Sequence, residues 1–159
     1  MKRIFISGGT SGIGRSTVQI FLDNGYTVGT TARNSEKKAA LLNSIDANQR
    51  NLDVQIVDLG DAKSFRDIEG FLSEFDPEIL INNAAMYSGN NLIETTQLEI
   101  DSMFTTNFSS VVFLSKACIN NWINQNKKGL ILNIGSTLGN KPAPGTSLYS
   151  ASKAALVSL

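Results

Sequence analysis

The segment that decides the fold is residues 2–14, which read KRIFISGGTSGIG. Its first half, Lys2 to Ser7, is a short apolar run that predicts a buried β-strand. A helical pattern follows from Ser11 to Asn24 and ends at Gly25. A glycine-rich turn between a strand and a helix N-terminus is typical of a phosphate-binding site, because the unpaired N–H groups and the helix dipole attract anions.

Three glycines of this turn have separate predicted roles. Gly8 permits the tight turn, Gly12 lets the backbone approach a pyrophosphate, and Gly14 allows the helix to pack closely on the strand. Their spacing, Gly-x-x-x-Gly-x-Gly, differs from the G-x-G-x-x-G fingerprint of dinucleotide-binding folds. The turn alone therefore leaves open that these glycines only close a tight connection.

The rest of the chain alternates short strand-like runs with longer helical patterns. Further strands are expected at Tyr26–Ala32, Leu52–Val57, Glu78–Ile81 and Leu130–Ile134. Further helices are expected from Asn34 to about Ala47, from Asp61 to Phe75, from roughly Thr96 to Gln125, and from near Ser147. This order predicts an α/β fold in one domain over residues 1–159. The expected architecture is a Rossmann-type doubly wound parallel sheet of five strands, with ligands at the carboxyl ends of the strands.

Composition excludes several classes of function. The 14 basic and 14 acidic side chains balance, so neither nucleic acid nor an anionic membrane is expected as a partner. No apolar run is long enough to span a bilayer, and we expect a cytoplasmic location. The chain has no histidine and one cysteine, which excludes Ser-His-Asp hydrolysis, histidine-ligated zinc and an internal disulfide. No metal site is predicted.

The end of the second expected strand bears on the cofactor. Folds that prefer NAD place an acid about 20 residues beyond the turn, where it binds the ribose 2′-OH. Here Ala32 occupies that position, Arg33 follows it, and no acid appears before Glu36. A guanidinium suits a 2′-phosphate, so we predict that NADP(H) is preferred and that NAD(H) is possible. The alternative is that Arg33 simply faces solvent.

An acid-base group is predicted near the end of the chain. Tyr149 and Lys153 are four residues apart on an expected helix, so their side chains share one face. A phenol has a pKa of about 10, and a neighbouring ammonium favours its ionised form. Tyr149 is then expected to exchange a proton with a substrate oxygen to which the Ser136 hydroxyl donates a hydrogen bond. Asn107, on the apolar stripe of the long helix, is expected to bond either a site water or a backbone carbonyl.

Taken together, these motifs resemble the short-chain dehydrogenase/reductase family over essentially the whole chain. The motifs that carry the resemblance are residues 7–14 (SGGTSGIG), Asp58-Leu59, residues 82–85 (NNAA), Asn107, Ser136 and residues 149–153 (YSASK). The resemblance implies an oxidoreductase that interconverts a carbonyl and an alcohol by hydride transfer. Its catalytic group would be Asn107, Ser136, Tyr149 and Lys153.

The resemblance also implies which residues hold the cofactor. Tyr149 and Lys153 would both contact the cofactor, and Lys153 would bind its nicotinamide ribose. Asp58 would face the adenine, Leu59 would contact it through backbone, and Asn83 would lie near a ribose. Arg33 stands where NADP preference is marked in this family. The remaining cofactor-binding positions are expected at Gly8, Thr10, Ser11, Gly12, Ile13, Gly14 and Ala84. A homo-oligomer, dimer or tetramer, would form through the long helix and the Tyr149 helix of a full-length chain.

Two departures from the family pattern lead to further expectations. Ala85 replaces a usual glycine and would be strained if its φ were positive. Family members continue beyond the Tyr149 helix, so we expect this chain to be the N-terminal part of a longer enzyme, with the fifth strand as an uncovered apolar edge. The substrate is expected near Met86, Tyr87 and residues 138–148. The alternatives are a non-catalytic nucleotide-binding protein, an inactive truncated remnant and a Rossmann-type methyltransferase.

Overall fold

The computed structural model describes residues 2–45 and 51–159. Five strands form one sheet in the order β3-β2-β1-β4-β5, and every neighbouring pair is parallel. The strands are β1 (Arg3–Ile6), β2 (Thr27–Ala32), β3 (Leu52–Ile56), β4 (Ile79–Asn82) and β5 (Leu130–Asn133). The predicted doubly wound parallel sheet of five strands is confirmed.

Helices connect the strands as the sequence predicts. They are α1 (Gly12–Asp23), α2 (Ser35–Asn43), α3 (Phe65–Phe75), α4 (Gln97–Phe104), α5 (Ser110–Asn124) and α6 (Ser147–Val157). Short 3-10 turns occupy η1 (Ala62–Ser64), η2 (Leu92–Glu94) and η4 (Thr137–Gly139). The helix expected to run to about Ala47 ends at Asn43, and Ala47 lies outside the described residues.

The predicted long helix from Thr96 to Gln125 has an internal irregularity that the sequence pattern did not reveal. A π-helical turn, η3 (Thr105–Ser109), joins α4 to α5. The hydroxyl of Ser110, the first residue of α5, donates to the carbonyl of Thr106 in this turn at 2.6 Å. A π turn holds one extra residue, so it rotates the helix face that follows. Asn107 lies inside this turn and is fully buried.

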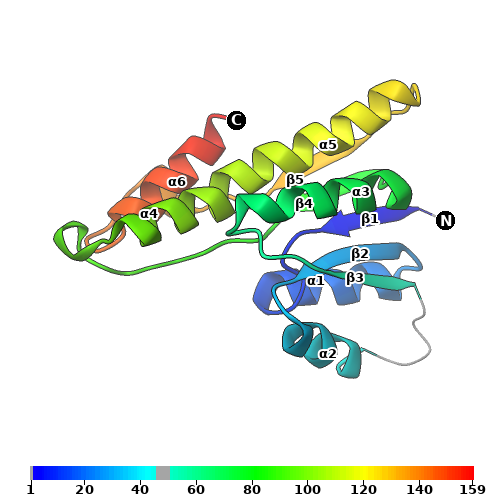
Figure 1. Cartoon of the computed structure of the whole chain (residues 1–159), viewed down its shortest axis with the longest axis horizontal. Helices are drawn as coiled ribbons and strands as arrows, with labels where there is room; N and C mark the ends of the chain where they lie inside the picture. Colours follow the sequence, from blue (N-terminus) through cyan, green and yellow to red (C-terminus); the bar gives the residue numbers. More distant parts are fainter. Residues whose placement is uncertain (1, 46–50) are drawn as a thin grey trace.

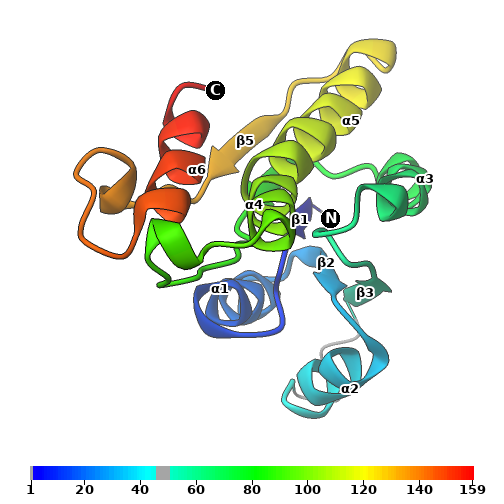
Figure 2. The same ribbon diagram turned by 60° about the vertical axis from the view of Figure 1, so that its left-hand side comes forward.

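Helices cover the two faces of the sheet separately. Figure 1 shows α1 and α2 on one side and α3 and α5 on the other, and Figure 2 shows α6 beside α4 near β5. Successive side chains of β1 point to opposite faces of the sheet. Phe5 packs with α3 and α5, whereas Ile4 and Ile6 pack with α1. Their full burial makes β1 the centre of both cores.

The amino-terminal edge of the sheet is tied together by Asp76. This residue ends α3 in the left-handed region, with φ 48°. Its carboxylate accepts from Arg3, at 3.2 Å, and from the ammonium of Lys127, which follows α5. These bonds join β1, the end of α3 and the segment after α5 at this edge.

Candidate active site

The glycine-rich turn leaves the carboxyl end of β1 with no room for side chains at Gly8, Gly9 and Gly14, and a Cβ on Gly9 would lie 2.2 Å from Thr30 Oγ1. Gly8 has φ +72°, and a Cβ there would lie 2.9 Å from the Ala84 Cα. A Cβ on Gly14 would lie 2.3 Å from the Gly8 carbonyl oxygen and 2.4 Å from Asn83 Nδ2. Gly12 has φ +52° and open space around its Cβ position. Conformation therefore favours glycine at residues 8 and 12, whereas close packing requires it at 14.

Neighbouring strands hold this turn in place by hydrogen bonds. The Gly8 N–H donates to Thr31 Oγ1 at 2.9 Å, and the Gly9 N–H donates to Thr30 Oγ1 at 3.0 Å. From the other side, Asn83 Nδ2 donates to the Gly8 carbonyl at 3.1 Å. These bonds use side chains of β2 and of the segment after β4, so the turn is fixed by both neighbours of β1.

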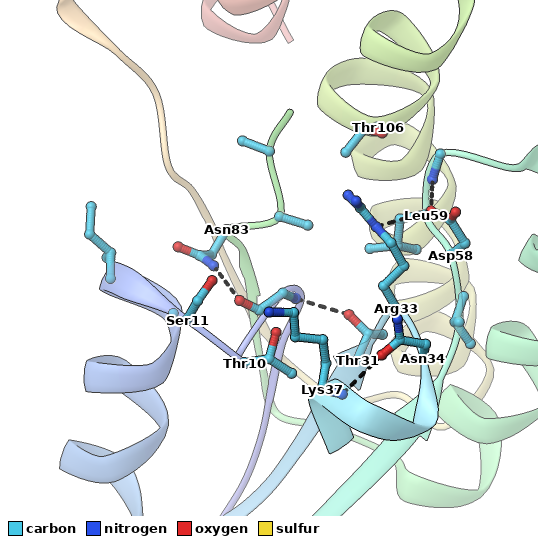
Figure 3. Close-up of a pocket in the computed structure, with 17 residues that line it drawn as sticks. Thr10, Ser11, Thr31, Arg33, Asn34, Lys37, Asp58, Leu59, Asn83 and Thr106 are labelled. Atoms are coloured by element: carbon cyan, nitrogen blue, oxygen red, sulfur yellow. Dashed lines mark hydrogen bonds and ion pairs between the residues drawn. The ribbon is translucent and has the colours of Figure 1, made fainter. Parts of the chain in front are cut away.

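A cavity of about 470 Å³ opens above the turn. Its lining comes from the glycine turn, the ends of β2 and β3, the start of α2, the segment after β4 and the π turn (Figure 3). The predicted cofactor residues that line it are Gly8, Thr10, Ser11, Ile13, Gly14, Arg33, Asp58, Leu59, Asn83 and Ala84. Gly12 belongs to the same turn but does not line the cavity, and Tyr149 and Lys153 lie outside the lining.

Two charged side chains of the cavity, Arg33 and Asp58, lie just beyond the ends of β2 and β3. Arg33 Nε lies 3.8 Å from Asp58 Oδ1, and both side chains are largely exposed, at 66% and 49%. Asp58 also accepts the Gly60 N–H at 2.9 Å, which fixes its orientation. Arg33 therefore faces the cavity beside a carboxylate, an ion pair that the sequence did not predict. Because both partners are exposed, this pair contributes little to stability.

Lys153 and Tyr149 meet on α6 as their spacing predicts. The Lys153 ammonium is 5.9 Å from the Tyr149 ring centroid and donates to the Ile134 carbonyl at 2.8 Å. Lys153 is almost wholly buried, and desolvation lowers its pKa from 10.5. The other neighbour of the Tyr149 ring is Tyr87, packed edge-on at 5.1 Å between centroids.

Asn107 makes three hydrogen bonds through its side chain. Its Oδ1 accepts the Met86 N–H at 2.7 Å, and its Nδ2 donates to the Met86 carbonyl and to Ser152 Oγ, each at 2.9 Å. Ser152 in turn donates to the Tyr149 carbonyl at 2.7 Å. Of the two expected partners for Asn107, the structure contains the backbone carbonyl, so this residue joins the segment after β4 to the helix that carries Tyr149.

Ser136 follows β5 and caps the short η4 turn. Its Oγ accepts the Leu138 N–H at 3.2 Å. The turn packs tightly on α6, because a Cβ on Gly139 would lie 2.9 Å from the Lys153 carbonyl carbon. The fold thus brings the Ser136 turn against the helix of Tyr149 and Lys153.

Several residues that line the cavity were not among the predicted cofactor-binding residues. They are Thr31, Asn34, Lys37, Val57, Gly60, Ala85 and Thr106. For Lys37 the sequence contains one indication of a role other than helix stability: a cation in the first turn of a helix opposes the helix dipole. Ala85 does not have a positive φ, so the replacement of glycine at this position carries no backbone strain.

Comparison with known proteins decides the family. The profile of a family described as short chain dehydrogenase matches residues 2–159. The chain belongs to the short chain dehydrogenase family. Members of this family are dehydrogenases and reductases, and the fold, the glycine turn and the Tyr149–Lys153 pair of this chain lie where the sequence pattern predicts.

Relatives within the family carry several names. The chain is 31% identical over 153 residues to 3-oxoacyl-[acyl-carrier-protein] reductase of Bos taurus, covering 96% of this chain and 63% of that protein. It is 29% identical over 157 residues to the NADP-dependent 3-hydroxy acid dehydrogenase YdfG of Salmonella typhi, covering 95% and 60%. A solved 4-hydroxyisoleucine dehydrogenase complexed with NADH matches with 27% identity and a TM-score of 0.91, covering 99% and 64%. The chain thus spans a little under two thirds of the length of these family members.

Two remaining features concern the rest of the described chain. None of the helices in residues 2–45 and 51–159 is long and apolar enough to cross a membrane. Cys118 is buried in the α3–α5 core, and desolvation raises the pKa of its thiol to about 12. Such a thiol is a packing group rather than a nucleophile.

Proposed function

We propose that this chain carries the cofactor and acid-base sites of an oxidoreductase that interconverts a carbonyl and an alcohol and prefers NADP(H) to NAD(H). The observation that carries this proposal is the buried Lys153 ammonium, 5.9 Å from the Tyr149 ring on the helix beside the Ser136 turn. A cation this close to the ring could stabilise the negative charge that develops on the phenol oxygen when it gives up its proton.

The residues around the cavity fit a dinucleotide. A Cβ on Gly8 or Gly14 would collide with neighbouring backbone, so neither position can carry a side chain. The turn therefore presents main chain to a bound group. Thr10, Ser11 and Ile13 at the start of α1 would hold the pyrophosphate, and Asp58 and Leu59 would hold the adenine. Arg33 supports NADP(H), because a guanidinium can bind a 2′-phosphate through two hydrogen bonds. When bound, the nicotinamide would supply or accept the hydride.

The chain's own residues would handle the proton. Tyr149 Oη would donate a proton to the substrate oxygen during reduction and accept it during oxidation. Lys153, anchored by the Ile134 carbonyl, would stabilise the phenolate that results. Ser136 Oγ would donate a hydrogen bond to the same oxygen. Asn107 would position the helix, since its amide bonds Ser152, which itself bonds the Tyr149 carbonyl.

The names of the relatives suggest substrates for a first assay. Two of them are named for 3-oxoacyl and 3-hydroxy acid substrates, so we propose a small carbonyl or alcohol compound and begin with 3-oxoacyl thioesters and 3-hydroxy acids. The exposed Tyr87, edge-on to Tyr149, would form one wall of the substrate site.

The proposal is tested by Tyr149→Phe. With any carbonyl that the chain reduces, we expect turnover to fall by about 10²–10⁴-fold, because the general acid is removed. Affinity for NADPH, followed by fluorescence titration, should fall far less than turnover, because the ring and all the other predicted cofactor residues remain. Tyr26→Phe is the matched control, since Tyr26 packs edge-on against Phe21 on the α1 side of the sheet.

Two results would contradict the proposed activity, and a third would contradict the proposed cofactor preference. Undiminished turnover in Tyr149→Phe would remove Tyr149 from the chemistry. Tight NADPH binding with no turnover in either protein would favour the alternative of a non-catalytic nucleotide-binding protein. Equal affinity of the unaltered chain for NADPH and NADH would overturn the cofactor preference alone.

A further inference from the structure

We propose that Lys37 is a second recognition residue for the 2′-phosphate of NADP(H), so that the anion is shared between Lys37 and Arg33. This inference rests on the proposed preference for NADP(H). The family resemblance implies that Arg33, at the end of β2, determines the preference for NADP(H). Lys37 would be an additional determinant, on α2.

The charges that line the cavity give the first argument. Only three charged side chains are among the lining residues: Arg33, Lys37 and Asp58. The carboxylate of Asp58 is 3.8 Å from Arg33 and offsets its charge. Without Lys37 the lining would be formally neutral and would have little attraction for a phosphate dianion. Lys37 gives the cavity its net positive charge.

The position of the Lys37 side chain gives the second argument. Within residues 2–45 and 51–159, the Lys37 ammonium has no hydrogen bond or ion pair. Figure 3 shows the side chain extending from the first turn of α2 towards the glycine-rich turn, whereas Arg33 extends towards Asp58. The two cations thus reach the cavity in different directions.

Local structure explains how Lys37 is held there. Asn34 caps α2, and its Oδ1 accepts the Lys37 N–H at 2.9 Å, which fixes the first helical turn. A lysine in this turn opposes the helix dipole. The neighbouring Lys38 has a partner, because its ammonium donates to the Val54 carbonyl at 2.7 Å. A bound phosphate would give Lys37 the anionic partner that it lacks.

Exposure of the Arg33–Asp58 pair gives the third argument. Arg33 is 66% exposed and Asp58 is 49% exposed, so solvent screens their attraction. A phosphate dianion can therefore compete for the guanidinium, but it would then lie near the Asp58 carboxylate. A second cation, facing the phosphate from a direction away from Asp58, would offset this repulsion. That is the role we assign to Lys37.

The experiment compares two probes that isolate the phosphate, 2′,5′-ADP and 5′-AMP, by isothermal titration calorimetry. For Lys37→Gln we expect the affinity for 2′,5′-ADP to fall about tenfold, as for loss of one charge-assisted hydrogen bond. The affinity for 5′-AMP should not change. Lys38→Gln is the matched control, because it removes the same charge one residue away and should keep the ratio of the two affinities. Lys37→Arg should restore the ratio.

The outcomes separate this inference from the proposed function. If the unaltered chain binds both probes equally, the NADP(H) preference fails and the role of Lys37 fails with it. In a second outcome, the unaltered chain favours 2′,5′-ADP, Arg33→Gln loses that preference and Lys37→Gln keeps it. That result would overturn only the role of Lys37. A general loss of fold would lower the affinity for 5′-AMP as well, so the ratio of the two affinities measures the role of Lys37, and an unchanged ratio in Lys37→Gln overturns it.

Discussion

Two neighbouring residues in the sheet differ sharply in burial although both are aliphatic. Ile81 of β4 and Leu132 of β5 are paired in register, so they lie on the same face. Ile81 is 4% exposed because α1 covers it, whereas Leu132 is 49% exposed. Leu130, two residues earlier on β5, is also largely exposed. The sheet is thus covered on both faces around β1 and open on one face at β5.

This difference separates two parts of the candidate site. The cavity above the glycine turn is lined by residues between Gly8 and Thr106, all from the covered part of the sheet and its helices. Ser136, Tyr149 and Lys153 come instead from the β5–α6 side, which is anchored through a few polar contacts. Nucleotide binding and proton transfer should therefore respond differently to mutation.

The largest effect is expected on the nucleotide side, for Gly14→Ala. The new Cβ would be 2.3 Å from the Gly8 carbonyl oxygen, and backbone cannot move away cheaply. We expect the free energy of unfolding to fall by about 3 kcal/mol and NADPH binding to become undetectable in a fluorescence titration.

Gly70→Ala is the matched control for this change. Gly70 is also helical, in α3, and a Cβ there would meet nothing within 4 Å. Replacing it should raise the free energy of unfolding by roughly 0.5–1 kcal/mol. If Gly14→Ala were as stable and bound NADPH as tightly as this control, the close packing of the turn would not matter for the site.

A smaller and more selective effect is expected for Asn107→Leu. The change leaves the Met86 N–H and carbonyl without their side-chain partner and removes the bond to Ser152. We expect a loss of about 2 kcal/mol in the free energy of unfolding, because buried polar groups become unpaired. Hydrogen exchange in α6 should rise, while the affinity for 5′-AMP should change little. Equal loosening of α1 and α6 would contradict the separation of the two sides.

The smallest effect is expected for Asp76→Asn. Asp76 lies at the amino edge of the sheet, where it contacts Arg3 of the covered part and Lys127, which precedes β5. The Lys127 ammonium, with help from Gln125 and Arg3, holds the pKa of the Asp76 carboxyl below its usual 3.8. A lowered acid pKa contributes stability that is fully present above 3.8 and is lost as the pH falls through the folded value. The substitution should cost about 1 kcal/mol at pH 7 and reduce the slope of stability against pH below pH 4.

Asp76→Ala sharpens this last test. Alanine also loses the charge, but it is strained at φ 48°, where asparagine is tolerated. Urea denaturation should therefore rank Asp76→Ala about 1 kcal/mol below Asp76→Asn at every pH. If the two variants were equally stable, the left-handed backbone at this position would not be a source of strain.

Sequence reasoning succeeded where the information is local. The short apolar run in residues 2–7 and the glycines of residues 8–14 predicted β1, the turn and α1, because strand pattern and glycine conformation depend on near neighbours. The four-residue spacing of Tyr149 and Lys153 likewise predicted that they share a face. The π turn was missed because residues 105–109 carry no breaker and fit a regular helix.

The sequence by itself determined the order of the elements, the parallel sheet, the glycine-rich turn and the family. Tertiary structure alone decided which groups meet: Arg33 with Asp58, Asn107 with Met86 and Ser152, and Lys37 with the cavity. These contacts join residues up to 45 positions apart in the chain. No periodicity encodes such pairs, because they arise only when helices of separate βα units pack on one sheet and bring their polar side chains to its carboxyl edge.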